Sequence, residues 1–474
     1  MLGVLAATSL DLARWQFGLT TLLHFAVVGV SIGLVTSVAL MQTRWLRTGD
    51  ERWLRATKYY GRAMLIVFAV GVVTGIIQTF QFGMNWAGFS RYVGDVFGAP
   101  LALEGLAAFF VESVFLGLWI FGWDRLSPRL HVACLWIVAS AAMLSAYAIL
   151  VANSWMQHPV GYELVDGRAR LTDVTAVLFN IDVALTTAHV LLSSLLTGAV
   201  IVLGIACLQL ARRRDVDVFE PLTRMTVVLG LFAALGAAGV GHFQGVVALE
   251  RQPMKMAAAE ALYETEAPAG LSLFAIGGLS SDPGPPPLNL RLPGALSFLN
   301  DLSFSSEVKG IDELQAQAEA EHGPGDYTPV VGLMYWSFRV MVGGGMALIA
   351  LMAWGVWLSY RDRLHTSRWF LRIAPVGMAL PFAAQAGGWV LREGGRQPWV
   401  VQGLLRTDAG ASDVTALAVA VSLAAFLAVY GLIFAVAARV LRAELGHGLP
   451  GTRSVPDRGP EAASGSTGDL ALSY

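Results

Sequence analysis

The stretch VALTTAHVLLSSLLTGAVIVLGIACLQ, residues 183–209, contains no aspartate, glutamate, lysine or arginine. About 20 consecutive apolar residues are enough for a helix to cross a bilayer core of about 30 Å. Because lipid offers no hydrogen-bonding partners, the backbone of such a segment must satisfy its own polar groups, which a helix does. The stretch therefore predicts a transmembrane helix, with the single histidine His189 near one of its ends.

Eight further stretches have the same character, and together they predict an all-α polytopic membrane protein with about nine transmembrane helices. The other stretches are 17–41, 62–80, 99–122, 130–152, 223–247, 330–358, 370–392 and 413–438. The composition agrees, because 55% of the 474 residues are hydrophobic and only 14% are charged, whereas soluble domains carry about a quarter charged residues. A net charge of −2 argues against a nucleic-acid partner. Cys134 and Cys207 both lie in apolar runs, so neither a disulfide framework nor a thiolate metal site is expected.

The short loops predict the orientation, because cytoplasmic loops are enriched in arginine and lysine. Basic residues are dense after spans one, five and seven, and two follow span three; the alternate loops carry fewer. This pattern places the N-terminus outside the cell and the C-terminus in the cytoplasm. The loop after span eight is an exception, with Arg392, Arg396 and Arg406, so these arginines are expected to serve another role.

The spans divide the chain into four parts. Residues 1–247 hold helices one to six, 248–329 form an external insert, 330–440 hold helices seven to nine, and 441–474 form a cytoplasmic tail. The insert is predicted to contain a short helix over 253–265 and an acidic helix over 311–321, on either side of a centre rich in Pro and Gly at 282–287. The tail is rich in Gly, Pro and Ser, a composition typical of disorder.

A few ionisable side chains lie inside the predicted spans, where charge is costly, so each is a candidate functional residue. They gather in the outer half of the membrane together with one methionine: His24, Glu104, Glu112, His189, Arg339, Met341 and Glu393. Each also has a simpler interpretation: a histidine can join two helices, Met341 can fill the core, and Arg339 can reach the interface. Most of the other histidines are expected to be solvated, namely His131, His158, His242, His322, His365 and His447.

These residue types point to haem. Histidine with methionine is the usual axial pair of a low-spin haem of fairly high potential, and one histidine with an open position suits a haem that binds a gas. An arginine at the same depth could hold propionates. No Cys-x-x-Cys-His motif is present, so covalent attachment is not expected. The intramembrane histidines are too few for a haem–copper oxidase, and His24 and His189 lack the paired partners of a bc-type cytochrome b.

Four motifs are more specific than composition. They are Gln81–Trp86 followed by Tyr92–Leu101 and Glu104-Gly105; Phe338–Met341; Gly395-Arg396-Gln397-Pro398-Trp399 directly after Glu393; and Arg14–Gly18 before His24. With these motifs in this order, the chain resembles subunit I of the cytochrome bd quinol oxidases over about residues 10–440. Thr79 stands where the family commonly has Glu, Leu23 stands where an aromatic residue is frequent, and the insert is short, as in one branch of the family.

The resemblance implies a ligand set. His189 and Met341 match the axial ligands of low-spin haem b, and Arg339 matches the arginine associated with that haem. His24 and Glu393 match the ligands of a site shared by high-spin haem b and haem d, and which of them serves which haem stays open. Further cofactor-binding residues are expected at Arg396 and Trp399. Acidic residues for haem binding and proton delivery match Glu104 and Glu112, and the quinol-site residues match Lys255 and Glu260.

The implied enzyme oxidises menaquinol or ubiquinol and reduces O2 to water with three haems and no copper. Uptake of protons from inside and release outside would generate a proton-motive force across a bacterial plasma membrane. The family works with a haem-free membrane subunit II and often with a very small third subunit. Two alternatives remain on the residues alone: a proton-coupled polytopic transporter without haem, and a haem protein that only transfers electrons.

Overall fold

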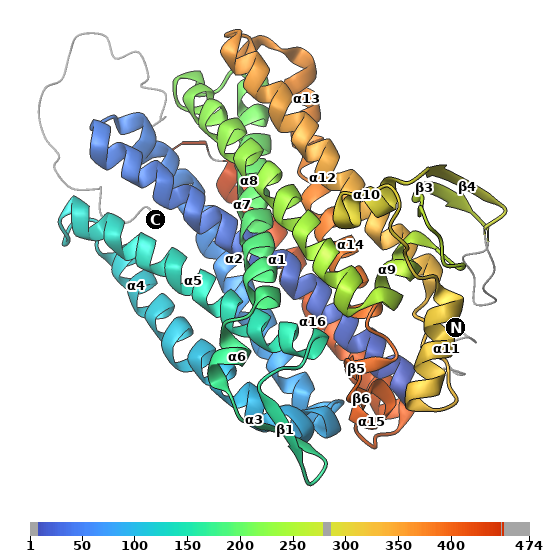
Figure 1. Ribbon diagram of the computed structural model, residues 1–474. Coiled ribbons are helices and arrows are strands. Elements are labelled where there is room, and N and C mark those ends of the chain that lie inside the picture. The colour runs from blue at the N-terminus through green and yellow to red at the C-terminus, as the bar shows by residue number, and fades with distance from the viewer. Residues whose placement is uncertain (1–7, 278–285, 447, 450–474) are drawn as a thin grey trace, which may run out of the picture.

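The protein is described by a computed structural model that covers residues 8–277, 286–446 and 448–449. Within these residues nine helical segments are long and apolar enough to cross a membrane, which confirms the predicted number. They lie side by side as a bundle (Figure 1). The first four spans are α1 (Ser9–Thr48), α2 (Glu51–Met84), the series α3 (Ala87–Ala102), η1 (Leu103–Phe109) and α4 (Phe110–Phe121), and α5 (Pro128–Gln157). The last five are α6 and α7 (Val174–Leu178, Ile181–Ala211), α8 (Val216–Arg251), α12 (Val331–Tyr360), α13 and α14 (Arg368–Gly377, Leu380–Gly394), and α16 (Ala416–Gly446).

Most helices extend beyond the apolar stretches that predict them, because polar residues at their ends also satisfy helical backbone groups. In α1 the Thr8 hydroxyl accepts from the Asp11 N–H at 3.1 Å, and the Asp11 carboxylate accepts from the Thr8 N–H at 3.2 Å. This capping box starts the helix well before the apolar stretch. At the other end Gly49, in the left-handed conformation with φ 67°, terminates it. The first span therefore covers 40 residues.

The two ends of the bundle differ in the length of their connections. Within the described residues, the connections at one end, called here the short-loop end, are limited to the turns at 49–50, 122–127, 212–215 and 361–367, the last containing η2 (Leu364–Thr366). The other, called the insert end, carries three β-hairpins and four short helices. The hairpins are β1 (Tyr162–Val165) with β2 (Arg168–Leu171), β3 (Leu271–Ile276) with β4 (Leu288–Leu292), and β5 (Trp399–Val401) with β6 (Leu405–Arg406). The short helices are α9 (Pro253–Glu260), α10 (Ala295–Asp301), α11 (Ile311–His322) and α15 (Thr407–Gly410).

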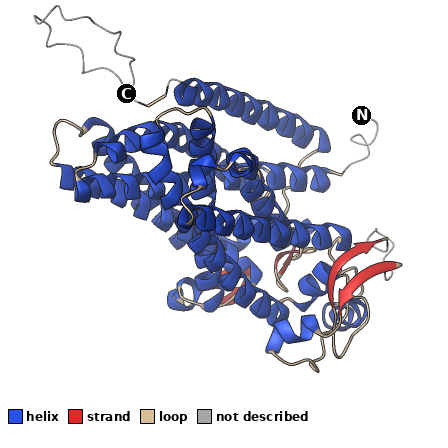
Figure 2. Ribbon diagram, turned by 90° about the horizontal axis from the view of Figure 1, so that it is seen from above, coloured by secondary structure: helices blue, strands red, loops and turns tan. Residues whose placement is uncertain are grey.

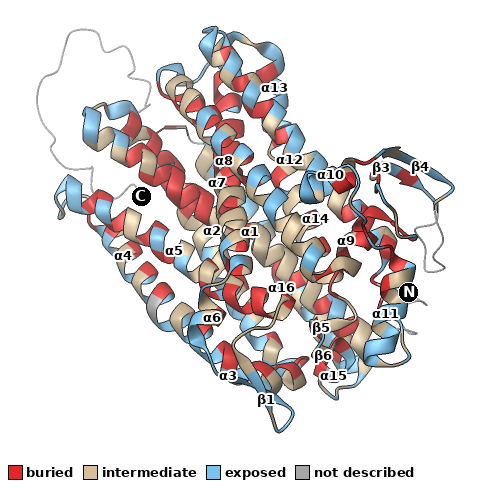
Figure 3. Cartoon of the chain, in the orientation of Figure 1, coloured by how far each residue is buried: buried red, intermediate tan, exposed pale blue. Residues whose placement is uncertain are grey.

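The half of the bundle towards the short-loop end is tightly packed. Its core joins α1, α2, α5, α7, α8 and α12, and Figure 3 shows buried residues concentrated in this half of α1. Helices α1 and α7 touch through glycines, because a Cβ on Gly198 would lie only 2.2 Å from the Gly33 carbonyl carbon. His131, expected among the solvated histidines, is buried here: its ring nitrogens bond to the Gln42 side chain at 2.6 Å and the Trp119 carbonyl at 2.8 Å.

Several local features differ from the sequence prediction. The third span is interrupted by the π-helical turn η1, and the three hairpins were not predicted. The first insert helix ends at Glu260 rather than near residue 265, because Ala261 adopts the left-handed conformation with φ 49°. The predicted acidic helix is confirmed as α11. Most of the Pro/Gly-rich centre of the insert and of the tail lies outside the described residues, although α16 continues to Gly446.

Candidate functional site

A large cavity occupies the half of the bundle towards the insert end. Its volume is about 1690 Å³, larger than the roughly 300–1,000 Å³ of a site for one small molecule. The cavity wall includes most of the residues singled out in the sequence: His24, Glu104, Glu112, His189, Lys255, Glu260, Met341, Glu393 and Arg396. Arg339 and Trp399 are not part of this wall. The fold therefore brings together, around one space, residues that are scattered over almost the whole chain.

His24, on α1, is oriented by α2. Its Nδ1 lies 2.9 Å from the Thr74 hydroxyl oxygen, and that hydroxyl already donates to the Val70 carbonyl at 2.8 Å. Thr74 must then accept from His24, so Nδ1 carries the proton and Nε2 carries the lone pair that a metal requires. A Cβ on Gly75 would lie 3.2 Å from the His24 Cε1 atom. The absence of a side chain at this position leaves the ring edge open.

His189, on α7, is held in the same way by α8. Its Nδ1 donates to the Ala237 carbonyl at 3.0 Å, which leaves the lone pair on Nε2. A Cβ on Gly241 would lie 3.1 Å from the His189 Cε1 atom, and a Cβ on Gly388 would lie 3.0 Å from the sulfur of Met341. Both glycines line the cavity. His24, His189 and Met341 thus each lie against a glycine that adds no side chain, an arrangement that leaves room for a flat ligand such as a porphyrin.

Glu104 and Glu112 occupy the interrupted third span. Glu104 lies in the π-helical turn η1 and accepts a hydrogen bond from the Ser145 hydroxyl at 3.3 Å; single π-turns inside helices are frequent at functional sites. Glu112 is buried in α4 and borders both the main cavity and a second, very small pocket formed with Ser31 and Met64. The Ser31 hydroxyl is buried without a hydrogen-bond partner among the described residues. Glu112 thus lies between the cavity and the tightly packed half.

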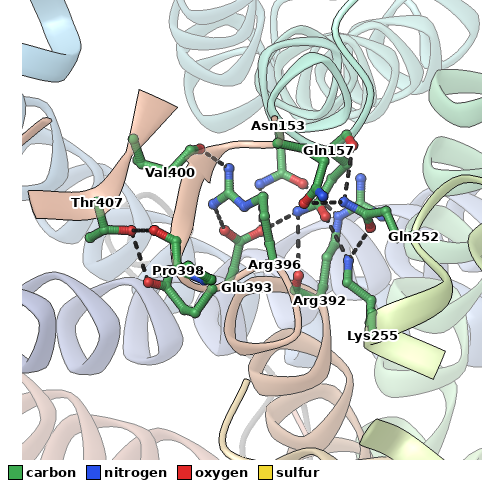
Figure 4. Close-up of polar contacts among 12 residues, drawn as sticks. Asn153, Gln157, Gln252, Lys255, Arg392, Glu393, Arg396, Pro398, Val400 and Thr407 are labelled. Atoms are coloured by element: carbon green, nitrogen blue, oxygen red, sulfur yellow. Dashed lines mark hydrogen bonds and ion pairs between the residues drawn. The ribbon is translucent and has the colours of Figure 1, made fainter. Parts of the chain in front are cut away.

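Glu393, at the end of α14, is the centre of a dense polar network (Figure 4). Its Oε1 accepts from the Asn153 amide at 2.8 Å and from the Gln157 amide at 3.2 Å, and its Oε2 pairs with Arg396. Arg396 is buried and also donates to the Val400 carbonyl, while its Nε has no partner among the described residues. A buried cationic donor with an unused N–H fits an anionic group such as a propionate.

Lys255, on α9, belongs to the same network. Its ammonium donates to the Gln157 side chain at 2.6 Å and to the Gln252 side chain. Burial lowers the pKa of Lys255 well below its usual range, and the neighbouring Arg392 and Arg396 lower it further against the opposing effect of Glu393. Gln157 therefore links the candidate quinol lysine directly to the candidate haem-ligand glutamate. The sequence motifs place these two residues in separate sites, whereas the structure joins them.

Glu260 is paired with Arg339. The closest atoms, Glu260 Oε2 and Arg339 Nη2, are 2.8 Å apart, and Oε2 also accepts from the Ser272 N–H at 3.0 Å. Arg339 further donates to the Ala259 and Ser272 carbonyls and lies over the Tyr335 ring at 3.9 Å. Burial raises the pKa of Glu260 above its usual value, although Arg339 opposes the shift. The Glu260 Oε1 atom is buried and has no partner among the described residues.

Comparison with known proteins shows the family of the chain. The family described as cytochrome bd terminal oxidase subunit I matches residues 12–449. The chain is 45% identical to cytochrome bd ubiquinol oxidase subunit 1 of Bacillus subtilis, over 89% of this chain and 90% of the relative. It is 32% identical to the bd-II ubiquinol oxidase subunit 1 of Escherichia coli, over 89% and 93%. The solved bd oxidase of Geobacillus thermodenitrificans superposes with a TM-score of 0.85 at 29% identity, covering 93% of this chain and 99% of that one.

The chain belongs to the cytochrome bd terminal oxidase subunit I family. It is thus a haem-containing subunit of a quinol oxidase in the bacterial cell membrane, and it works with a subunit II, with quinol and with O2. The transporter alternative is not supported. The family's use of haem agrees with a large cavity that has His24 and His189 in its wall.

Trp399 of this oxidase subunit lies in an aromatic cluster rather than at the cavity. Its ring is 4.9 Å from that of His322 and 5.9 Å from that of Tyr327, and the Arg406 guanidinium lies over Tyr327 at 5.4 Å. The cluster joins hairpin β5–β6 to the end of α11. The Trp399 N–H donates to the Arg396 carbonyl at 3.0 Å, so the turn that carries Arg396 is connected to this aromatic cluster.

Sequence reasoning missed one polar cluster of this oxidase at the cavity wall. Arg251, at the end of α8, forms an ion pair with Asp182 at the start of α7, and the His158 Nδ1 atom lies 3.2 Å from Arg251 and 3.6 Å from Asp182. All three residues line the cavity beside Gln252. Each lies at the end of a span, where hydropathy alone predicts a solvated residue. Only the contact between the ends of three helices reveals the cluster.

Proposed function

We propose that this chain carries the three haems of the oxidase, low-spin haem b, high-spin haem b and haem d, and couples menaquinol or ubiquinol oxidation to proton-motive force. The observation that carries the proposal is the large cavity whose wall contains both candidate histidine ligands and the Lys255 and Glu393 network. When bound, haem supplies one-electron transfer and activation of O2, which protein side chains do not provide.

The ligand assignment follows from tautomers and position. His189 and Met341 would hold the low-spin haem b, since a His–Met pair gives a fairly high potential. His24 and Glu393 would hold the other two haems. Support comes from the proton on the Nδ1 atom of each histidine, because both rings then present Nε2 to the cavity. Arg396 would neutralise a propionate through its unused Nε.

Quinol would be oxidised where α9 meets the cavity. A quinol that becomes a quinone releases two electrons and two protons. Glu260 has a buried Oε1 without a partner among the described residues, so it can accept one of these protons, and Lys255 can hydrogen-bond a quinol oxygen. The predicted orientation places α9 at the outer face, and protons released there would enter the external medium.

Protons for water formation would arrive from the opposite side. Glu112 lies between the cavity and the packed half of the bundle, next to the small pocket that also contains the unpartnered Ser31 hydroxyl. We assign proton uptake to Glu112, with Glu104 nearer the haems. The inner position of this route rests on the arginine distribution of the loops. A very small single-helix third subunit is proposed as a further partner.

The test is a reduced-minus-oxidised absorption spectrum of the purified enzyme with its subunit II. A red-shifted chlorin band together with the bands of both haem b types is the expected result. A spectrum with haem b alone would remove haem d from the proposal, and a low-spin haem b alone would reduce the chain to an electron-transfer protein. The quinol preference follows from the ratio of kcat/KM for a menaquinol and a ubiquinol of equal tail length.

A further inference from the structure

The hairpin β3–β4 has its polar and apolar faces exchanged relative to a hairpin in water. Its strands pair Phe274 with Leu290 and Ile276 with Leu288, and a bulge at Leu273 keeps these side chains on the same face as Leu292. The five residues Phe274, Ile276, Leu288, Leu290 and Leu292 are each between 43% and 61% exposed. An antiparallel hairpin with one solvated face normally places polar residues there.

The opposite face of the hairpin carries the polar residues and is turned towards the protein. Ser272 is buried and bonds to the Asn289 side chain at 2.6 Å and to the Tyr335 hydroxyl at 2.8 Å. Arg291 forms a bidentate ion pair with Glu266, the two bonds measuring 2.6 and 2.7 Å. These hydrogen bonds and this ion pair hold the polar face against the protein, so the apolar face of the hairpin is turned away from it.

The exposed face of the hairpin adjoins the side of the bundle. Phe274 contacts Trp336 of α12 edge-on, with ring centroids 5.5 Å apart, and Trp336 is itself partly exposed, as are Leu333 and Val340 on the same helix. Figure 1 shows the hairpin beside α10 and α12, at the edge of the molecule, and in Figure 2 its two strands project beyond the helices. The apolar face of the hairpin thus continues the exposed apolar surface of α12, with Trp336 at the junction. Tryptophan is enriched at membrane interfaces.

The hairpin β1–β2 provides a contrast within the same chain. It lies at the tip of the insert end in Figure 1 and pairs Glu163 with Arg170 and Val165 with Arg168. Glu163, Arg168 and Arg170 are all exposed, so its outer face is mainly charged, as expected in water. The two hairpins belong to the same end of one bundle. Hairpin β1–β2 exposes the leucine Leu164, whereas β3–β4 exposes a row of five apolar side chains.

We propose that the apolar face of β3–β4 is inserted among the lipid acyl chains of the leaflet at the insert end, where it forms one wall of the route by which quinol enters from the bilayer. Leu271 of β3 and Leu299 of α10 both line the cavity, and Leu299 is also exposed, so the apolar surface runs from the hairpin to the cavity. The Ser272 N–H bonds directly to Glu260. The quinol route rests on the proposed quinol site, whereas the lipid contact does not.

The lipid contact is tested by spin labels on the oxidase in phosphatidylcholine–phosphatidylglycerol nanodiscs. Leu290→Cys and, as the matched control on β1, Leu164→Cys are labelled in a background with Cys134→Ala and Cys207→Ala, keeping only preparations with an unchanged haem spectrum. We expect the Leu290 label to be relaxed by O2, which concentrates among acyl chains, and the Leu164 label by a water-soluble nickel complex. Nickel access at both positions, or shielding of the Leu290 label from both reagents by a protein partner, would overturn the proposal.

The quinol route is tested by Leu290→Asp, with Leu164→Asp as its control. Loss of one leucine contact with lipid predicts a KM for a long-tailed quinol in nanodiscs raised roughly tenfold, with little change for a short-tailed quinol added from water. Equal effects on the two quinols, or on the two variants, would contradict the route. Glu260→Gln tests the proposed quinol site separately from the lipid contact. If the quinol site is elsewhere, Glu260→Gln stays active with both quinols, and the spin-label result for Leu290 is unaffected.

Discussion

The two halves of the helix bundle are built in opposite ways. Towards the short-loop end the helices approach so closely that Gly33 and Gly198 touch, and a buried histidine, His131, has both ring nitrogens occupied by protein groups. Towards the insert end the same helices enclose about 1690 Å³, and His24 and His189 each have one ring nitrogen fixed and the other left with a lone pair. A histidine is thus structural where the helices close on it and a candidate ligand where glycines keep space beside it.

The largest effect is expected from the removal of His189. His189→Ala should eliminate the low-spin haem b spectrum and reduce quinol oxidation by more than the roughly 10–100-fold that loss of an outer-shell partner causes. The control is His365→Ala at the short-loop end, where the His365 Nδ1 atom lies 3.2 Å from Glu220. This variant should retain the low-spin haem b spectrum and quinol oxidation. Haem content per polypeptide is the measurement. A normal low-spin spectrum in His189→Ala would show that His189 is not a haem ligand, and it would contradict the division into structural and ligand histidines.

Glu112 lies at the boundary between the two halves, so its replacement tests whether the packed half conducts protons. Glu112→Gln should slow O2 reduction by roughly 100-fold, the lower range for loss of a positioned acid or base, while the haem spectrum stays mostly intact. Glu444→Gln, which changes an ion pair with Arg62 at the short-loop end, should leave turnover unchanged. Unaltered turnover in Glu112→Gln would exclude the assigned route.

The packed half is tested by its glycine contact. Gly198→Ala would place a Cβ against the Gly33 backbone, and overpacking of this kind costs about 1–3 kcal/mol. We expect a lower Tm and less folded protein, with normal haem content and turnover in the folded fraction. Gly117→Ala in α4 is the control, because no heavy atom lies within 4 Å of its Cβ, and its Tm should not fall. Loss of haem from Gly198→Ala without a change in Tm would contradict a purely structural role for the packed half of the bundle.

The features that the sequence predicts are those that depend on residues close together in the sequence. Hydropathy identifies the nine spans of the described residues because each helix satisfies its own backbone, and the order of the motifs identifies the family. The hydrogen bond between Lys255 and Gln157 joins residues 98 positions apart, so no local pattern contains it. The exchanged faces of β3–β4 depend on a bulge that shifts the alternation by one residue. Chemistry that depends on contacts in space, such as the tautomer of His24 set by Thr74, likewise requires the fold.

The smallest effect concerns the pH dependence of quinol oxidation. The pKa of Glu260 is raised by burial and lowered by Arg339, so Arg339→Gln should raise it further. Because a proton acceptor must be a carboxylate, activity is lost as pH falls through this pKa, and the acid limb of kcat/KM for quinol should therefore move to higher pH. Arg291→Gln removes a smaller contribution to the same carboxyl and should move the limb less. An acid limb that Arg339→Gln leaves in place, or moves to lower pH, would show that a group other than Glu260 accepts the proton.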